Sequence, residues 1–211
     1  MACQSEPQSV AQPALIAQQS ARSEAFFMCW INTSCPLVFL AIALPGSALA
    51  DERLWDLLKS GGQVVLIRHT ITTPGAGDPP GMRLDDCGSQ RNLTDAGRRH
   101  ARRIGEEWRA RKIPVERVLS SPWCRCLETA RLAFGKAETS QALSNLFGRY
   151  ENREPQVRAL RELVSKTGKG NLVLVTHGST ISALTGISPD TGEMVILSQG
   201  ALAGRLAVEE N

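Results

Sequence analysis

Short, uninterrupted aliphatic runs constrain the fold of this chain more than any other feature. Residues 64–67 (Val-Val-Leu-Ile) and 172–175 (Leu-Val-Leu-Val) are entirely aliphatic, and residues 115–120 form a third strand-like segment. Continuous runs of this length are typical of strands that are buried on both faces in a parallel sheet. Segments with helical spacing separate the three runs, and this alternation predicts an α/β fold with a mostly parallel central sheet.

The predicted helices follow from apolar spacing and from the residues that start and end them. Thr94 is a suitable N-cap for a helix that ends before Pro114. Ser121 followed by Pro122 predicts the start of a helix that runs to about residue 134. The other predicted elements are helices at 51–60, 154–166 and 179–184 and terminal strands at 193–197 and 205–208, while residues 135–153 show only candidate core residues at Leu143, Leu146 and Phe147.

The first fifty residues have the features of a secretory leader. Residues 37–44 are an uninterrupted apolar stretch, and residues 48–50 (Ala-Leu-Ala) have the small side chains that a signal cleavage site needs. Polar residues at 32–34 leave far fewer than the ~20 apolar residues of a membrane-spanning helix, so an anchor is the weaker alternative. The leader is long, and Met28 is an alternative start. The sequence predicts a leader at 1–50, cleaved after Ala50, and a domain at 51–211 that is exported to the periplasm without stable membrane insertion.

The charge of the chain argues against a nucleic-acid partner. The sequence contains 24 Lys and Arg residues against 21 Asp and Glu residues, a net charge of +3. An arginine-rich segment at 98–111 is interrupted by Glu106 and Glu107. This pattern is typical of a solvated helix face, so no nucleic acid is predicted to bind.

The cysteines support export only weakly. Removal of the leader leaves Cys87, Cys124 and Cys126. In an oxidising compartment Cys87 can pair with either of the other two, which leaves one thiol over. The alternatives are three buried, reduced cysteines, or a zinc site that also uses His100. Because Cys-x-Cys is not a usual zinc-ligand spacing, no metal site is predicted.

Residues suited to holding a phosphoryl group follow each of the three strands. Arg68 and His69 end the first strand, Arg125 lies in the helix after the second, and His177 follows the third. The ligand crevice of an open α/β sheet lies beyond the carboxyl ends of its strands, so we expect these side chains to meet. Guanidinium groups and the start of a helix suit a dianion. An unprotonated imidazole is also a nucleophile that can accept a phosphoryl group without a metal.

Each of these residues also has a structural interpretation. A single histidine after an apolar strand is more often a hydrogen-bonded structural residue than a catalyst. However, His69 and His177 are two of only three histidines in the chain, and both follow buried strands directly. The pattern therefore favours a shared site.

A long loop is predicted between the first strand and the next helix. Residues 70–92 are rich in Gly and Pro and are too long for a simple connection. We expect this loop to select the substrate and to act as a lid that becomes ordered with ligand.

Four motifs together resemble the histidine phosphatase superfamily. The motifs occur in the family's order from about residue 64 to residue 187, and they are 66–69 (LIRH), 92–97 (NLTDAG), 121–130 (SPWCRCLETA) and 173–178 (VLVTHG). The resemblance implies a three-layer α/β/α fold and a phosphohistidine intermediate on His69, with no cofactor. It also implies that Arg68, Arg125 and a cationic His177 surround the phosphate, and that Ser121 adds a hydrogen bond.

Two positions depart from the family's pattern. Thr70 replaces the glycine or glutamate that usually follows the first motif's histidine, so it is expected either to donate a hydrogen bond to the phosphate or to narrow the pocket. Gly178 stands where some members carry an aspartate that protonates the leaving group. Among the remaining acids we name Glu151 as the candidate proton donor, and the alternatives are Asp85, Asp86 and Glu154.

The sequence thus predicts a metal-independent phosphomonoester hydrolase acting through a phosphohistidine on His69. Its partner is expected to be a small phosphorylated substrate, and export favours a phosphorylated envelope sugar such as a heptose phosphate. The alternatives are a phosphoglycerate-mutase-like phosphotransferase, a non-catalytic phosphate-binding module and a regulatory protein histidine phosphatase. Export disfavours the mutase and the regulatory phosphatase, because their substrates are cytoplasmic.

Overall fold

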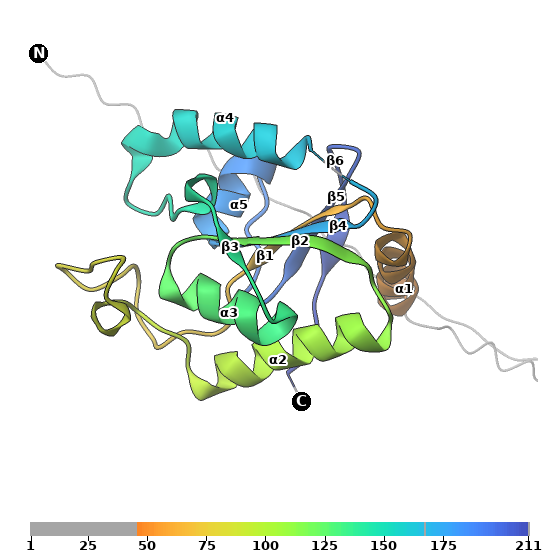
Figure 1. The fold of residues 1–211 in the computed structure, drawn as a ribbon, viewed down its shortest axis with the longest axis horizontal. Coiled ribbons are helices and arrows are strands. Elements are labelled where there is room, and N and C mark those ends of the chain that lie inside the picture. Colours follow the sequence, from red (N-terminus) through yellow and green to blue (C-terminus); the bar gives the residue numbers. More distant parts are fainter. Residues whose placement is uncertain (1–45, 167, 211) are drawn as a thin grey trace, which may run out of the picture. The chain divides into compact units, whose positions relative to one another are not determined.

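The computed structural model describes residues 46–166 and 168–210. Six strands in this part of the chain form one sheet in the order β3-β2-β4-β1-β5-β6 (Figure 1). The run from β3 to β1 is parallel, and β5 and β6 extend the sheet as antiparallel strands. The strands are β1 (Val64–Arg68), β2 (Val115–Ser120), β3 (Glu138–Thr139), β4 (Asn171–Thr176), β5 (Met194–Ser198) and β6 (Ala201–Leu206).

Alternate residues of the central strands supply two separate cores. Val65 and Ile67 pack in the same cluster as residues of α1 (Gly46–Lys59), α2 (Asp95–Ala110) and α3 (Cys124–Phe134). Val64 and Leu66 point the other way, into a cluster with α4 (Arg153–Val164) and α5 (Gly178–Thr185). Figure 1 shows α2 and α3 on one side of the sheet and α4 and α5 on the other. The predicted three-layer α/β/α fold with a mostly parallel sheet is therefore confirmed.

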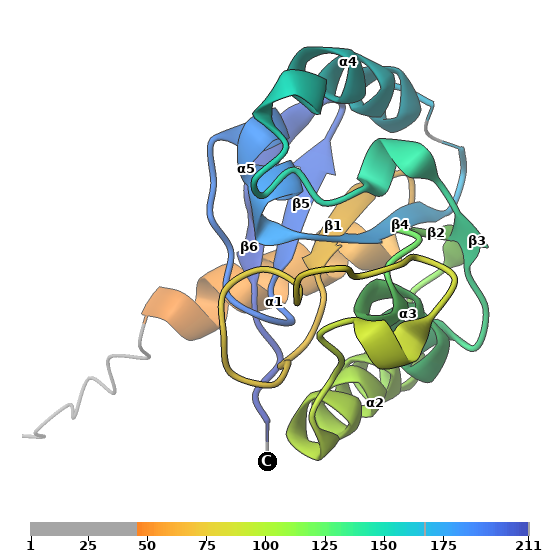
Figure 2. The same ribbon diagram turned by 90° about the vertical axis from the view of Figure 1, so that its left-hand side faces the viewer.

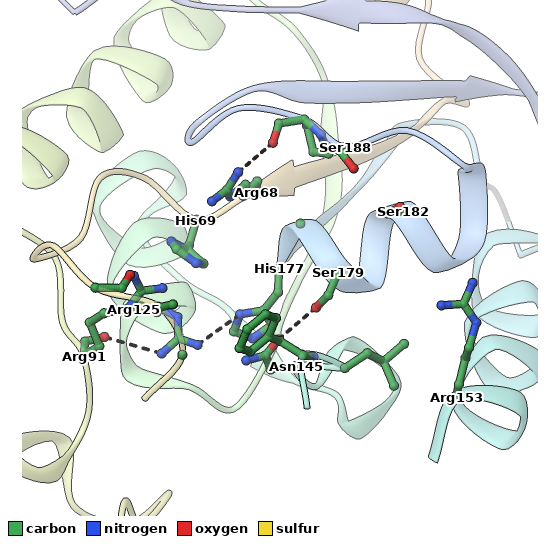
Figure 3. A pocket seen from close by; sticks show the side chains of 17 residues that line it. Arg68, His69, Arg91, Arg125, Asn145, Arg153, His177, Ser179, Ser182 and Ser188 are labelled. Atoms are coloured by element: carbon green, nitrogen blue, oxygen red, sulfur yellow. Dashed lines mark hydrogen bonds between the residues drawn. The ribbon is translucent and has the colours of Figure 1, made fainter. Parts of the chain in front are cut away.

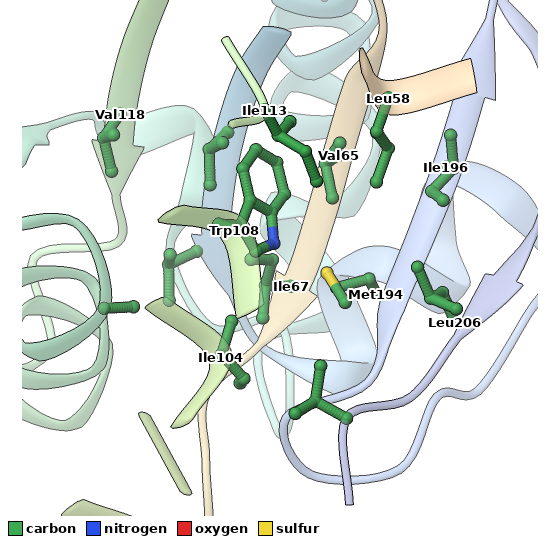
Figure 4. Close-up of a cluster of buried hydrophobic side chains, with 14 of the residues drawn as sticks. Leu58, Val65, Ile67, Ile104, Trp108, Ile113, Val118, Met194, Ile196 and Leu206 are labelled. Carbon is green, nitrogen blue, oxygen red and sulfur yellow. The ribbon is translucent and has the colours of Figure 1, made fainter. Parts of the chain in front are cut away.

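The cluster under α1, α2 and α3 contains three buried tryptophans, Trp55, Trp108 and Trp123. Trp108 is 2% exposed and lies against β1 (Figure 4). Its indole ring packs edge-to-face on Phe134 of α3, with ring centroids 5.2 Å apart. A Cβ atom at Gly105 would overlap the Ala133 carbonyl oxygen, so glycine is required where α2 crosses α3. Thr94 caps α2 as predicted, because its Oγ1 accepts the Gly97 amide hydrogen.

Three local predictions are wrong. Helix α3 begins at Cys124, and the Ser121 side chain bonds to His177 instead of capping the helix. The last strand lies at Ala201–Leu206, because the chain turns back directly after β5 and pairs with it. Phe147 is 56% exposed, whereas Leu143 and Leu146 are buried as expected.

Helix α1 extends across the expected leader boundary. Residues 1–45 lie outside the described residues, and α1 begins at Gly46, before the cleavage site predicted after Ala50. The side chains that anchor α1 in the core are Leu54, Trp55 and Leu58. Cleavage after Ala50 would therefore leave every one of these anchoring residues in the domain.

Cys87 and Cys124 form a disulfide bond, and Cys126 is buried and free. His100 Nε2 lies 2.8 Å from the Val208 carbonyl oxygen, so the zinc alternative is wrong for these residues. Within residues 46–166 and 168–210, no group of His, Cys, Asp and Glu side chains has a metal-binding arrangement. None of the helices described there has the length and apolar character needed to cross a bilayer.

Candidate active site

The two predicted histidines lie next to each other because β1 and β4 are neighbours in the sheet. Arg68 pairs with Thr176 in the parallel register, so the next residue of each strand is a histidine. The His69 and His177 rings are 5.5 Å apart between centroids. Both line a cavity of about 510 Å³, together with Arg68 and Arg125 (Figure 3). The structure thus brings together four side chains that the sequence predicts to meet.

The hydrogen bonds of His69 leave one ring nitrogen suited to nucleophilic attack. Its Nδ1 lies 2.9 Å from the Thr70 carbonyl oxygen, an acceptor that requires a hydrogen on Nδ1. The lone pair therefore resides on Nε2. Burial, and secondarily the positive charges of Arg125 and Arg68, lower the pKa of His69 from 6.5 to about 3. The imidazole is consequently neutral and unprotonated at Nε2 at physiological pH.

His177 is also neutral in the free protein, and its predicted cationic form during phosphoryl transfer stays a prediction. Its Nε2 lies 2.8 Å from Ser121 Oγ, and its Nδ1 lies 3.4 Å from an Nη2 donor of Arg125. An arginine can only donate, so Nδ1 accepts and the proton resides on Nε2. Burial, followed by the neighbouring His69 and Arg125, holds the pKa of His177 well below 6.5.

Arg125 is held in place by an acid that the sequence reasoning missed. The guanidinium is 1% exposed, and it forms a forked ion pair with Asp78 at 2.5 Å from Nη1 and 3.1 Å from Nη2. Trp123 Nε1 donates to the same carboxylate at 3.0 Å. Burial opposes the charge of Asp78, but the hydrogen bonds and charge of Arg125 prevail and hold its pKa below the usual range.

Arg91 is a second cavity residue that the sequence reasoning missed. It lines the cavity beside His69 and Arg125, and its Nη1 donates to the Gly75 carbonyl oxygen. A signal was present, because Arg91 directly precedes the motif at 92–97. For Asp78 the signal is weaker: it is the only acid between Thr70 and Leu84.

Three predicted site residues do not line the cavity. Thr70 is fully buried, and its amide and Oγ1 each lie 3.2 Å from Thr129 Oγ1. Ser121 is fully buried behind His177 and contacts its ring. Glu151 is exposed in the short helix η3 (Tyr150–Asn152), where its Oε1 accepts a hydrogen bond from Asn152. The predicted contacts of Thr70, Ser121 and Glu151 with a bound substrate are therefore not supported by their positions.

The long loop between β1 and α2 is tied to the body of the domain. Figure 2 shows it, in yellow, passing beside α3. Cys87 of this loop is bonded to Cys124, and Gln90 Oε1 accepts the Cys124 amide hydrogen at 3.0 Å. Thr72 and Leu93 form an isolated bridge that closes the base of the loop. The loop is thus attached at several points without a ligand, and it carries Asp78 and Arg91; its expected ordering with ligand stays a prediction.

A comparison with protein-family models shows which family this sequence resembles. The family model of the histidine phosphatase superfamily (branch 1) matches residues 64–157, which include His69 and Arg125. Over these residues the sequence is similar to the histidine phosphatase superfamily. This match supports phosphatase-type chemistry at the cavity. His177 lies beyond the matched residues, and its place in the site comes from the structure.

Solved structures show the same fold at low sequence identity. Phosphoserine phosphatase from Entamoeba histolytica in complex with 3-phosphoglyceric acid is 14% identical, with a TM-score of 0.53, and the match covers 70% of this chain and 98% of that one. TTHB049 from Thermus thermophilus is 19% identical with a TM-score of 0.52, covering 69% and 99%. Rv3214 from Mycobacterium tuberculosis is 18% identical with a TM-score of 0.51, covering 70% and 96%. No curated protein sequence matches the chain.

Proposed function

We propose that this protein is a metal-independent phosphomonoester hydrolase that forms a phosphohistidine on Nε2 of His69. One observation carries the proposal: the Thr70 carbonyl holds the hydrogen on Nδ1, so a neutral nucleophile faces a cavity lined by guanidinium groups. Arginine donors match the oxygen atoms of a phosphoryl group. A buried imidazole with these neighbours is suited to phosphoryl transfer.

The reaction proceeds in two displacements. His69 Nε2 attacks phosphorus while the bond to the leaving oxygen breaks, and that oxygen keeps the electron pair and takes a proton from water. Water then attacks the phosphohistidine, which releases orthophosphate and restores the neutral ring. Arg68, Arg91 and Arg125 stabilise the charge on the transferred group. An incoming dianion also favours protonation of His177, because an opposite charge raises the pKa of a neighbouring imidazole.

The proposal is tested by trapping the intermediate. The enzyme is mixed with 4-nitrophenyl phosphate, quenched, and the phosphorylated peptide is located by mass spectrometry under non-acidic conditions. We expect an acid-labile phosphate on His69 and a loss of roughly a thousand-fold or more in kcat for His69→Ala. His100→Asn is the matched control, because His100 bonds to Val208 outside the cavity. Wild-type turnover by His69→Ala would overturn the mechanism.

The same experiment separates hydrolysis from the other candidate functions. A hydrolase releases orthophosphate in proportion to the nitrophenol formed. A phosphotransferase resembling the mutases would return the phosphoryl group to an added sugar phosphate acceptor. A binding module would hold phosphate without any turnover, and a protein histidine phosphatase would accept a phosphohistidine peptide in preference to the aryl ester.

We also propose that the domain is exported and acts on a phosphorylated envelope sugar. The apolar stretch at 37–44 supports export, and so does the Cys87–Cys124 disulfide, because such bonds persist in oxidising compartments. Cell fractionation with intact-mass analysis tests this: a periplasmic protein that begins at Asp51 is expected. A cytoplasmic protein that retains residues 1–50 would contradict it.

A further inference from the structure

The cavity extends well beyond the groups that would hold a phosphoryl group. Its volume of about 510 Å³ is typical of sites that enclose a whole small molecule. Figure 3 shows Arg68, His69, Arg91 and Arg125 toward one end and Arg153 at the opposite end. A substrate that fills this cavity therefore places its leaving group toward Arg153.

Arg153 is free to bind an anion. It is exposed at the start of α4, and its side chain points toward Ser182 of α5 in Figure 3. Within the residues that the structure describes, Arg153 makes no ion pair, in contrast to the forked pair of Arg125 with Asp78. A positive charge in the first turn of a helix is unfavourable, because the amino-terminal end of the helix dipole is itself positive. Stabilisation of α4 therefore does not explain an arginine at this position.

Polar groups between His177 and Arg153 can also donate hydrogen bonds, and Figure 3 shows Asn145 beside His177 and Ser182 on the side of Arg153. Asn145 is 8% exposed, and its Oδ1 accepts hydrogen bonds from the Phe147 amide at 3.1 Å and from Ser179 Oγ at 2.9 Å. Both bonds use the oxygen, which orients the side chain and leaves the Nδ2 donors for a ligand. Ser182, half-buried on α5, lines the cavity on the side of Arg153.

We propose that Arg153 and Ser182 form a subsite for a second anionic group, a carboxylate or a phosphate, carried by the leaving group of the substrate, and that Asn145 donates to the part of the substrate between this subsite and His177. The inference rests on the proposed function for the phosphoryl end. A guanidinium binds carboxylate and phosphate through paired hydrogen bonds, and the amide and hydroxyl groups supply further donors. Leu146 and Phe147 line the wall of the cavity and provide apolar contact for the carbon skeleton. Arg153 thereby selects substrates that are anionic at both ends.

Two aryl substrates that differ by one carboxylate test the subsite. The values of kcat/KM for phenyl phosphate and 4-carboxyphenyl phosphate are compared in the wild type, Arg153→Ala, Arg153→Lys and Arg158→Ala. Arg158 is the matched control, because it is an exposed arginine of the same helix and does not line the cavity. We expect Arg153→Ala to lower the preference for the carboxylated substrate roughly ten-fold or more, mainly through KM. Arg153→Lys should retain part of the preference, and Arg158→Ala all of it.

A binding measurement keeps this test independent of turnover. Phenylphosphonate and 4-carboxyphenylphosphonate cannot be hydrolysed, and their Kd values are measured by calorimetry on the same variants. Tighter binding of the carboxylated compound that is lost in Arg153→Ala supports the subsite even if no variant is catalytically active. Equal losses for both compounds in Arg153→Ala, or a retained preference, would overturn it. A failure of turnover alone would count against the hydrolase and not against the subsite.

Discussion

The candidate site is made of two halves that are built differently. One half, His69 and His177, follows adjacent parallel strands and is positioned by the sheet itself, as the bond from the His69 amide to the Thr176 carbonyl shows. The other half, Asp78 and Arg91, comes from a loop that is held by side chains and by a disulfide bond. Arg125 belongs to α3 but depends on the loop for its counter-ion. The sheet therefore positions the two histidines, whereas side-chain contacts and the disulfide bond of the loop position Asp78 and Arg91.

The largest expected effect is on the sheet-built half. His177→Asn should lower kcat for 4-nitrophenyl phosphate by about a hundred-fold or more, because it removes a group that stabilises the transferred phosphoryl charge. The melting temperature is measured alongside, since His177 is buried against Ser121 and Trp123. A folded variant with kcat within about three-fold of the wild type would contradict the shared role of the two histidines.

A substitution in the loop half tests whether Arg125 needs its counter-ion. Asp78→Asn leaves a guanidinium that is 1% exposed without a charged partner, and removing one member of a buried pair costs about 3 kcal/mol. We expect a lower urea midpoint and a decrease of roughly thirty-fold in kcat/KM. Asp85→Asn is the control, because Asp85 is an exposed acid of the same loop whose one ion-pair partner among the described residues is Arg83. If both variants behaved alike, the loop would not be positioning Arg125.

Removal of the disulfide should have a smaller effect on activity. The double variant Cys87→Ser with Cys124→Ser is expected to unfold more easily by about 2–4 kcal/mol, since the bond restricts the unfolded chain over a separation of 37 residues. The kcat/KM should fall less than in Asp78→Asn, because the Asp78 ion pair remains. Wild-type protein treated with a reductant provides the second measurement. Unchanged activity and unchanged stability would show that the disulfide bond is not needed to hold the loop in position.

Mild acid should lower the free energy of unfolding of the domain, because His69 is buried in its neutral form. His69 has a pKa of about 3 in the folded protein against 6.5 in the unfolded chain, so protonation favours the unfolded state between these values. The stability that neutral His69 permits is fully present above pH 6.5 and is lost as the pH falls toward 3, by about 2 kcal/mol for this histidine at pH 5. Urea unfolding at pH 7 and pH 5 measures the loss. A His69→Asn variant should lose less stability on acidification, and an identical loss would refute the assignment.

The smallest effect is expected at the sequence-based candidate for the proton donor. Glu151 is exposed in η3 and does not line the cavity, so Glu151→Gln should change kcat by less than about two-fold. Substrates with poor and good leaving groups are compared, because only a poor leaving group needs a general acid. A selective loss with the poor leaving group would restore Glu151 as the proton donor.

The sequence was sufficient to predict the sheet-built half. Continuous aliphatic runs identify β1 and β4, and parallel strands bring the residues after them to one edge of the sheet. His69 and His177 could therefore be placed together with no knowledge of the loops. Thr94 was equally predictable as an N-cap, because its role depends on residues only three positions away.

The loop half could not be predicted in the same way. A loop rich in Gly and Pro has no periodicity, so residues 70–92 give only a weak indication of which acid turns inward. Asp78 is selected by a partner that lies 47 positions later in the chain. The same limitation explains Ser121 and Thr70, whose hydroxyl groups bond to His177 and Thr129 through contacts that only the folded chain creates.

The concentration of positive groups around the cavity also bears on how a catalytic cycle would end. On the proposed mechanism, the guanidinium groups that bind the phosphoryl oxygens of the ester would also bind free orthophosphate; they belong to Arg68, Arg91 and Arg125. In that mechanism, orthophosphate therefore occupies the same position as the phosphoryl group of the ester. Ambient inorganic phosphate would act as a competitive inhibitor, so the enzyme would work fastest where phosphate is scarce.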